Sequence, residues 1–186
     1  AEPAFTGSPA EFVLATAIGT FGLFNVVVLL CRLGRVSWRD LGWTTSRLGT
    51  ELLWGVLGFT ACAAAIMATT TALGGRDALR EFVTAVGAYS PASRLLFLAI
   101  GLSAAAYEES IFRGYLQPAL SARWGNAVAI LVTAAIFSLY HLQLNPVGLL
   151  VKLCFGMVFG TLRWRRGSLV APAAAHVLVW VILGAA

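Results

Sequence analysis

The sequence predicts an all-helical membrane protein with about six transmembrane helices and short interfacial helices. Of its 186 residues 59% are hydrophobic and only 11% are charged, whereas a soluble domain carries about 25% charged residues. Uncharged runs alternate with short links that contain most of the arginines, and a helix needs about 20 apolar residues to cross a bilayer. We therefore expect residues 1–186 to form a single integral membrane domain.

The first half of the chain contains two predicted spans. Residues 12–31 are uncharged and form the first, and residues 52–75 form the second, which ends at a pair of glycines. Residues 32–51 interleave arginine with tryptophan, which indicates either a helix lying in the interface or a basic loop with anchoring tryptophans. In residues 76–93 apolar side chains recur at helical spacing, so we expect a short amphipathic helix at the membrane surface.

The second half divides into four predicted spans, at residues 94–121, 126–144, 146–163 and 168–186. Asn145-Pro146 separates the second of these from the third, because this dipeptide favours a turn. The third also contains three glycines that would allow close helix packing: Gly148, Gly156 and Gly160.

Charge and cysteine content exclude several classes of protein. The net charge is +5, but the basic residues are spread over the links, as in membrane proteins whose topology they fix. No basic face suited to nucleic acid is visible, so we expect the lipid bilayer and not nucleic acid as a partner. The three cysteines show no CxxC spacing, which gives no support for a disulfide framework or a zinc knuckle.

Glu108 and Glu109 are expected to lie inside the membrane. The uncharged run at residues 95–107 covers about 20 Å as a helix, less than the roughly 30 Å hydrocarbon core, so a span starting near Arg94 must include both acids. Glu109 and Arg113 are four residues apart with the acid first, which favours an ion pair. Glu108 is rotated about 100° from Glu109 and lacks that partner. The alternative is a helix that ends at Tyr107, with the charges among the headgroups.

The chain has two histidines, His141 and His176, and both lie in other predicted spans. A glutamate and a histidine together can polarise water for attack on a peptide carbonyl, and a second histidine can donate to the resulting oxyanion. Zinc held by Glu108, His141 and His176 is the alternative, although no HExxH signature is present. A serine nucleophile at Ser110 or Ser138 has no GxSxG motif to support it.

Three motifs resemble those of the CAAX prenyl protease and bacteriocin-processing (CPBP, or Abi) family of intramembrane proteases. They are Glu108-Glu109-Ser-Ile-Phe-Arg113 (EExxxR), Phe137-Ser-Leu-Tyr-His141 (FxxxH) and the run from Gly160 through Arg166-Gly167-Ser168-Leu169 and Pro172 to His176. The resemblance extends over residues 94–186, which we expect to form the family-like catalytic core.

The resemblance implies an endopeptidase that hydrolyses a membrane-anchored protein substrate, either lipidated or tethered at its C-terminus. By motif position Glu108 would activate the water with help from His141, and His176 would stabilise the oxyanion. Glu109 and Arg113 would be structural or tuning partners.

The last motif departs from the family pattern HxxxN (or Asp), because Trp180 occupies its fourth position. We expect Asn145 or the indole of Trp180 to replace the missing oxyanion donor. An inactive family member that acts as a membrane scaffold is an alternative function, and so is a proton-coupled transporter.

We favour a protease without a cofactor, because glutamate and histidine suffice to activate water, with zinc as the alternative. Arginine supplies twelve of the thirteen basic residues and alanine is abundant, which is typical of a high-GC bacterium. We therefore expect a multi-pass protein of the plasma (inner) membrane.

Overall fold

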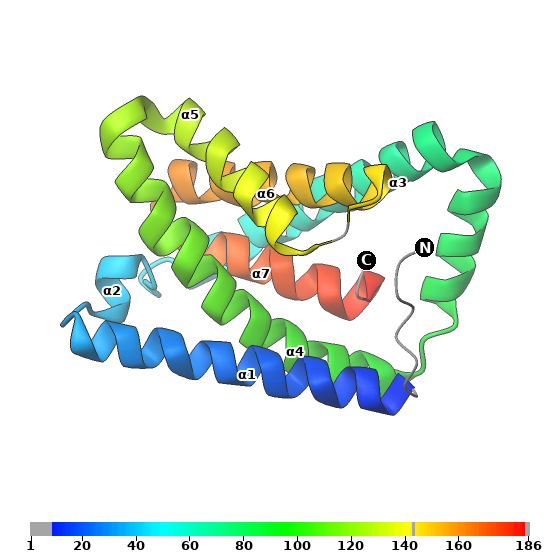
Figure 1. Cartoon of the computed structure of the whole chain (residues 1–186), viewed down its shortest axis with the longest axis horizontal. Coiled ribbons are helices and arrows are strands. Elements are labelled where there is room, and N and C mark those ends of the chain that lie inside the picture. Colours follow the sequence, from blue (N-terminus) through cyan, green and yellow to red (C-terminus); the bar gives the residue numbers. More distant parts are fainter. Residues whose placement is uncertain (1–8, 143, 185–186) are drawn as a thin grey trace.

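The computed structural model describes residues 9–142 and 144–184, which are mostly helical and contain no strand. The predicted helical fold class is therefore confirmed (Figure 1). The elements are α1 Pro9–Leu33, α2 Trp38–Leu41, α3 Leu48–Gly87, α4 Pro91–Glu109, the π-helix η1 Ser110–Leu116, α5 Gln117–Tyr140, α6 Pro146–Arg166, α7 Val170–Leu178 and the π-helix η2 Val179–Leu183.

The number of full-length spans differs from the prediction of about six. In the described ranges four helical stretches are long and apolar enough to cross a membrane: Leu14–Leu33, Leu48–Gly87, Pro91–Tyr140 and Pro146–Arg166. The spans predicted at 94–121 and 126–144 both fall within the stretch Pro91–Tyr140, which is kinked at Gly125, where the backbone leaves the helical conformation at φ 77°. The predicted division between them is present as this kink. The last predicted span is the shorter apolar helix Val170–Leu183, and residues 185–186 of that prediction lie outside the described residues.

Two links between the spans fold largely as expected. Within α3, Gly75 adopts φ 76°, a conformation that glycine tolerates and that turns the helix sharply. Residues 76–87 beyond this bend form the predicted amphipathic helix (Figure 1). The link after α1 contains only the short α2, where the Ser37 side chain accepts from Asp40 N and the Asp40 side chain accepts from Ser37 N. This reciprocal cap fixes the start of α2.

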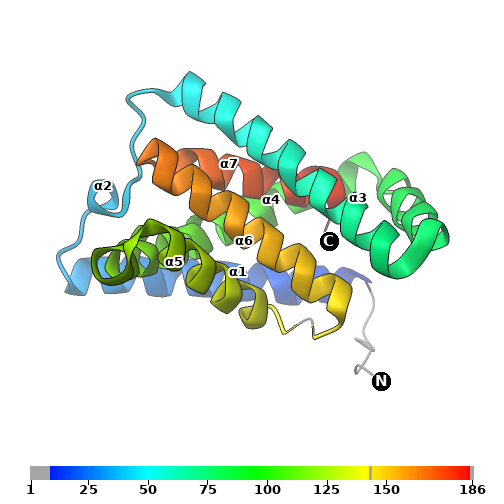
Figure 2. The same ribbon diagram turned by 90° about the horizontal axis from the view of Figure 1, so that it is seen from above.

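Helix α7 lies in the middle of the bundle. It contacts α3, α4 and α6, while α1 packs on α4 and α5 packs on α6 (Figures 1 and 2). The core between these helices is rich in aromatic side chains, and its fully or nearly fully buried members include Phe112, Phe137, Phe155 and Phe159. The C-terminal helix is thus the element around which the others are arranged.

Gly156 allows α6 to approach α5 closely. A Cβ atom at this position would lie 2.6 Å from the Cα of Ala134, which is backbone and cannot move aside. At Gly160 the nearest atom to such a Cβ is Gln117 Oε1 at 3.2 Å, a milder contact. Of these two glycines, Gly156 therefore has the least room for a side chain, and the predicted close helix packing is tightest there.

We predict that Gly156→Ala forces α5 and α6 apart and lowers the free energy of unfolding by about 1–3 kcal/mol, as overpacking does. Thermal unfolding of the purified protein in detergent measures this effect. Gly19→Ala in α1 is the matched control, because a Cβ there has open space. An equal loss of stability in both variants would contradict the close-packing interpretation.

Candidate functional site

Both glutamates of the sequence motif lie inside the bundle. Helix α4 continues past Tyr107 to Glu109 and passes directly into η1, so the alternative of a helix that ends at Tyr107 is wrong. The exposed fractions of Glu108 and Glu109 are 5% and 0%. The π-helical turn that follows them is a rare conformation that occurs frequently at functional sites.

The predicted Glu109–Arg113 ion pair is confirmed. Arg113 Nη1 lies 3.2 Å from Glu109 Oε1, and neither side chain is exposed. The guanidinium lies 4.3 Å from the centre of the Phe137 ring, and its Nη2 donates to the carbonyl oxygen of Gly156 at 3.4 Å. Arg113 therefore fixes Glu109 and at the same time connects η1 to α5 and α6.

Helix α7 places His176 between the two glutamates. Its Nδ1 lies 3.1 Å from Glu109 Oε1, and because Arg113 pairs with this carboxylate, Nδ1 is the donor. Its Nε2 lies 3.7 Å from Glu108 Oε2. The ring stacks on Phe159 of α6 with centroids 5.1 Å apart, which fixes its orientation.

His141 approaches Glu108 from the end of α5. Its Nδ1 lies 2.8 Å from the carbonyl oxygen of Phe137, and because a carbonyl can only accept, Nδ1 carries a proton. Its Nε2 lies 4.0 Å from Glu108 Oε2, and 21% of the His141 side chain is exposed. Both histidine Nε2 atoms thus face one buried carboxylate oxygen, which has no hydrogen-bond partner among the described residues.

Two tyrosines that sequence reasoning missed complete the surroundings of Glu108. The Tyr107 hydroxyl donates to Glu108 Oε1 at 2.8 Å and lies 3.0 Å from the Tyr140 hydroxyl. Because Tyr107 uses its single proton on Glu108, Tyr140 is the donor to Tyr107. The sequence suggested that Glu108 has no partner, because no cation lies four residues away. In the structure Glu108 instead accepts this hydrogen bond from Tyr107. The available signal was adjacency in sequence, since Tyr107 precedes Glu108 and Tyr140 precedes His141.

Asn145 and Trp180, the predicted oxyanion donors, have contacts outside the cluster of glutamates and histidines. The side-chain oxygen of Asn145 accepts from the backbone N–H of Gly148 at 2.8 Å and caps α6. Trp180 packs between helices, where it faces Gly101 and lies 6.4 Å from the Phe97 ring. Neither side chain has a hydrogen bond to the glutamates or histidines of the site in the part of the chain that the structure describes.

The possible zinc ligands Glu108, His141 and His176 face one another, as the distances above show. Across residues 9–142 and 144–184, however, no group of three or more His, Cys, Asp or Glu side chains is arranged to hold a metal ion. We therefore derive no chemical step through a metal.

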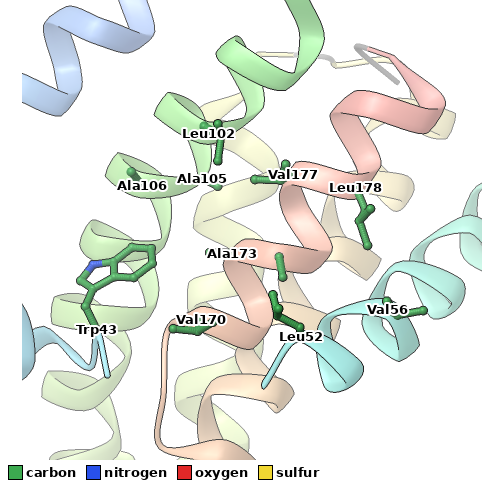
Figure 3. Close-up of a pocket in the computed structure, with 11 residues that line it drawn as sticks. Trp43, Leu52, Val56, Leu102, Ala105, Ala106, Val170, Ala173, Val177 and Leu178 are labelled. Carbon is green, nitrogen blue, oxygen red and sulfur yellow. The ribbon is translucent and has the colours of Figure 1, made fainter. Parts of the chain in front are cut away.

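An apolar groove of about 530 Å³ lies between α3, α4 and α7 (Figure 3). Its lining residues are all hydrophobic: Trp43, Leu52, Val56, Leu102, Ala105, Ala106, Val170, Ala173, Ala174, Val177 and Leu178. Trp43 stands at one end, and its Nε1 donates to Ser110 Oγ at 2.9 Å, next to Glu109. Ala105 and Ala106 directly precede Tyr107, so the groove borders the segment that carries the glutamates.

The region that contains the site matches a known protein family. A family model described as type II CAAX prenyl endopeptidase Rce1-like matches residues 90–182. This range includes both glutamates, Arg113 and both histidines. Comparisons with curated proteins and with solved structures gave no significant match.

We predict that Arg113→Met lowers the free energy of unfolding by about 3–5 kcal/mol, because it leaves the buried carboxylate of Glu109 without its cation. Thermal unfolding in detergent is the measurement. Arg80→Met removes the cation of an exposed pair with Asp77 and should leave the melting temperature nearly unchanged. If the two variants have the same melting temperature, the buried Glu109–Arg113 pair does not stabilise the fold as described.

Proposed function

The chain belongs to the Rce1-like family of type II CAAX prenyl endopeptidases, and we propose that it is an intramembrane endopeptidase using water activated by Glu108. Membership of a protease family and four helices long enough to cross a bilayer support a membrane-embedded peptidase. The observation that carries the mechanism is the convergence of two imidazole nitrogens on Glu108 Oε2, at 3.7 and 4.0 Å. The expected substrate is a lipidated or C-terminally membrane-tethered protein.

The geometry around Glu108 Oε2 supports the proposed activation of water. Separations of 3.7 and 4.0 Å are too long for direct hydrogen bonds and suit a bridging water. With a proton on Nδ1, neutral His141 presents a lone pair at Nε2, so this water donates one hydrogen to His141 and the other to Glu108. As the water oxygen attacks the peptide carbonyl carbon, Glu108 takes the proton and the carbonyl electron pair moves onto oxygen.

The remaining steps return that proton to the leaving group. Glu108 passes it to His176 Nε2 through a bridging water, and the Glu109 carboxylate at Nδ1 stabilises the resulting imidazolium. The imidazolium donates to the oxyanion and then gives its proton to the amine nitrogen as the carbon–nitrogen bond breaks. Glu108 is a carboxylate again at the end of the cycle. In this scheme His176 acts without help from Asn145 or Trp180.

The apolar groove is our candidate for the hydrophobic part of the substrate. Its lining is entirely hydrophobic, and it borders the α4 residues that directly precede the glutamates. A lipid chain or an apolar peptide segment can bury its surface there without leaving polar groups unpaired. We also propose that the protein resides in the plasma membrane of a bacterium, for the compositional reasons given above.

A catalytically inactive membrane scaffold is the second candidate function. The observation that favours it is Trp180, which stands where the resembling family motif has Asn or Asp and whose ring lies 6.4 Å from that of Phe97. The buried and oriented Glu108, His141 and His176 favour the enzyme, because burying them without a function would be costly in a bilayer.

We predict that Glu108→Gln and His141→Ala each lower the rate of cleavage by about 10²–10⁴-fold, the contribution of a general base. Activity is measured in proteoliposomes on a prenylated CAAX peptide and, separately, on a membrane-tethered reporter protein. Glu81→Gln, an exposed glutamate of α3, is the matched control and should retain full activity. Undiminished cleavage by both site variants, with the wild-type melting temperature, would rule out this mechanism.

A second prediction concerns metal dependence. We expect the purified protein to contain zinc well below one ion per chain and to keep its cleavage activity after treatment with a chelator, because Glu108 and His141 activate the water. Elemental analysis and the same cleavage assay provide the measurements. Zinc near one ion per chain, with activity lost on its removal and restored on its return, would instead establish the zinc-dependent alternative.

A further inference from the structure

Tyr107 is held in a cluster that includes helix α1. It is buried, and its ring packs with Val27 of α1 and Ala104 of α4 in a cluster against which Trp180 also packs. From this position its hydroxyl donates to Glu108 Oε1 at 2.8 Å. The mechanism above uses the other carboxylate oxygen, so Tyr107 contacts Glu108 without occupying the oxygen that binds the water.

Tyr140 supplies a second hydroxyl from the neighbouring helix α5. This hydroxyl lies 3.0 Å from that of Tyr107, to which it donates. The Tyr140 ring lies edge-on to Phe112 of η1 and to His141, with centroids 5.6 and 5.5 Å apart, and such contacts restrict where the ring can lie. The two hydroxyls and the carboxylate therefore form a chain of hydrogen bonds, Tyr140–Tyr107–Glu108, that connects α5 to α4.

The two oxygens of the Glu108 carboxylate have different surroundings. Oε1 accepts from Tyr107, whereas Oε2 has no hydrogen-bond partner among the described residues and faces His141 and His176 at 4.0 and 3.7 Å. A carboxylate that is bound at one oxygen cannot rotate without breaking that hydrogen bond, and hydrogen bonds to ionised groups are strong ones. The bond from Tyr107 therefore fixes the direction in which Oε2 points.

We propose that Tyr107 and Tyr140 are positioning residues that hold Glu108 with Oε2 directed at the two histidines. Their effect on catalysis rests on the proposed function. Tyr107 acts directly on Glu108. Tyr140 acts only through Tyr107, because it orients the Tyr107 hydroxyl and strengthens the hydrogen bond that this hydroxyl donates. Neither tyrosine exchanges a proton with the substrate in this assignment.

The kinetic test compares Tyr107→Phe, Tyr140→Phe and the variant with both changes in the cleavage assay with the prenylated CAAX peptide. Each change removes one hydroxyl and keeps the ring. Tyr107→Phe should lower kcat by roughly ten- to hundredfold with KM unchanged, because Glu108 loses a hydrogen bond to a charged group. Tyr140→Phe should lower kcat by about two- to fivefold, since it removes a bond between neutral groups. The double variant should match Tyr107→Phe, because Tyr140 then has no route to Glu108.

Tyr115→Phe is the matched control, because Tyr115 is an exposed tyrosine of η1 and should keep wild-type kcat. Wild-type kcat in Tyr107→Phe, or a loss that appears in KM alone, would overturn the proposal. So would effects of Tyr107→Phe and Tyr140→Phe that multiply in the double variant. If Tyr107→Phe does not fold, Tyr140→Phe decides the question, since this residue is 42% exposed; wild-type kcat there would also overturn the proposal.

A stability cycle tests the hydrogen bond between Tyr107 and Glu108 without reference to proteolysis. Tyr107→Phe and Glu108→Met each remove one partner of this bond, and melting temperatures in detergent are compared for both single variants and the double variant. Tyr107→Phe should lower the melting temperature by several degrees in the wild-type background and by much less in the Glu108→Met background. Equal effects in the two backgrounds would overturn the proposal. Folding of Tyr107→Phe only together with Glu108→Met would support it, and folding in neither background would overturn it.

The two measurements separate this proposal from the proposed function. A wild-type protein without cleavage activity would contradict the proposed function, while the stability cycle still decides whether Tyr107 holds Glu108. Coupled melting temperatures together with wild-type kcat in Tyr107→Phe would instead refute the positioning role and leave the proposed function intact.

Discussion

The buried guanidinium of Arg113 is the group on which the arrangement of the site depends. It pairs with Glu109, donates to the Gly156 carbonyl and lies over aromatic rings from α5 and α6. A fully buried charge is tolerated only where such partners surround it. Its requirements therefore fix the position of η1 against two neighbouring helices. The same contacts set the orientation of the Glu109 carboxylate, which in turn holds the Nδ1 side of His176.

Around this pair the bundle encloses a small polar region in an otherwise apolar interior. Glu108 is approached on one carboxylate oxygen by a tyrosine hydroxyl and on the other by two imidazoles. Electrostatic interactions are strong where water is excluded, so the protonation state of each member depends on its neighbours. The backbone hydrogen bond of His141 and the carboxylate contact of His176 both leave Nε2 directed at Glu108. This shared orientation suits proton transfer within the region.

The link between α1 and α3 supports this region from outside. The Gly42 carbonyl oxygen accepts from Leu169 N at 2.8 Å, directly before α7, and Trp43 donates to Ser110 at the start of η1. The link therefore connects the helix that carries His176 with the π-helix that follows the glutamates. Residues 34–47 contain little regular structure, yet they help to set the relative position of two elements of the candidate site.

By itself the sequence determined the apolar helices, the burial of the two acids and the Glu109–Arg113 pair. These features depend on hydrophobic run length and on four-residue spacing along one helix, which are local properties. Only the tertiary structure decided that Glu108, His141 and His176 converge, because they come from three helices whose contacts depend on how side chains such as Phe159 pack. It also decided the partners of Glu108, the way in which the chain turns at the Gly125 kink, and the capping of α6 by Asn145. The spacing of hydrophobic residues along the sequence could predict none of these contacts, since it describes each helix alone and not its neighbours.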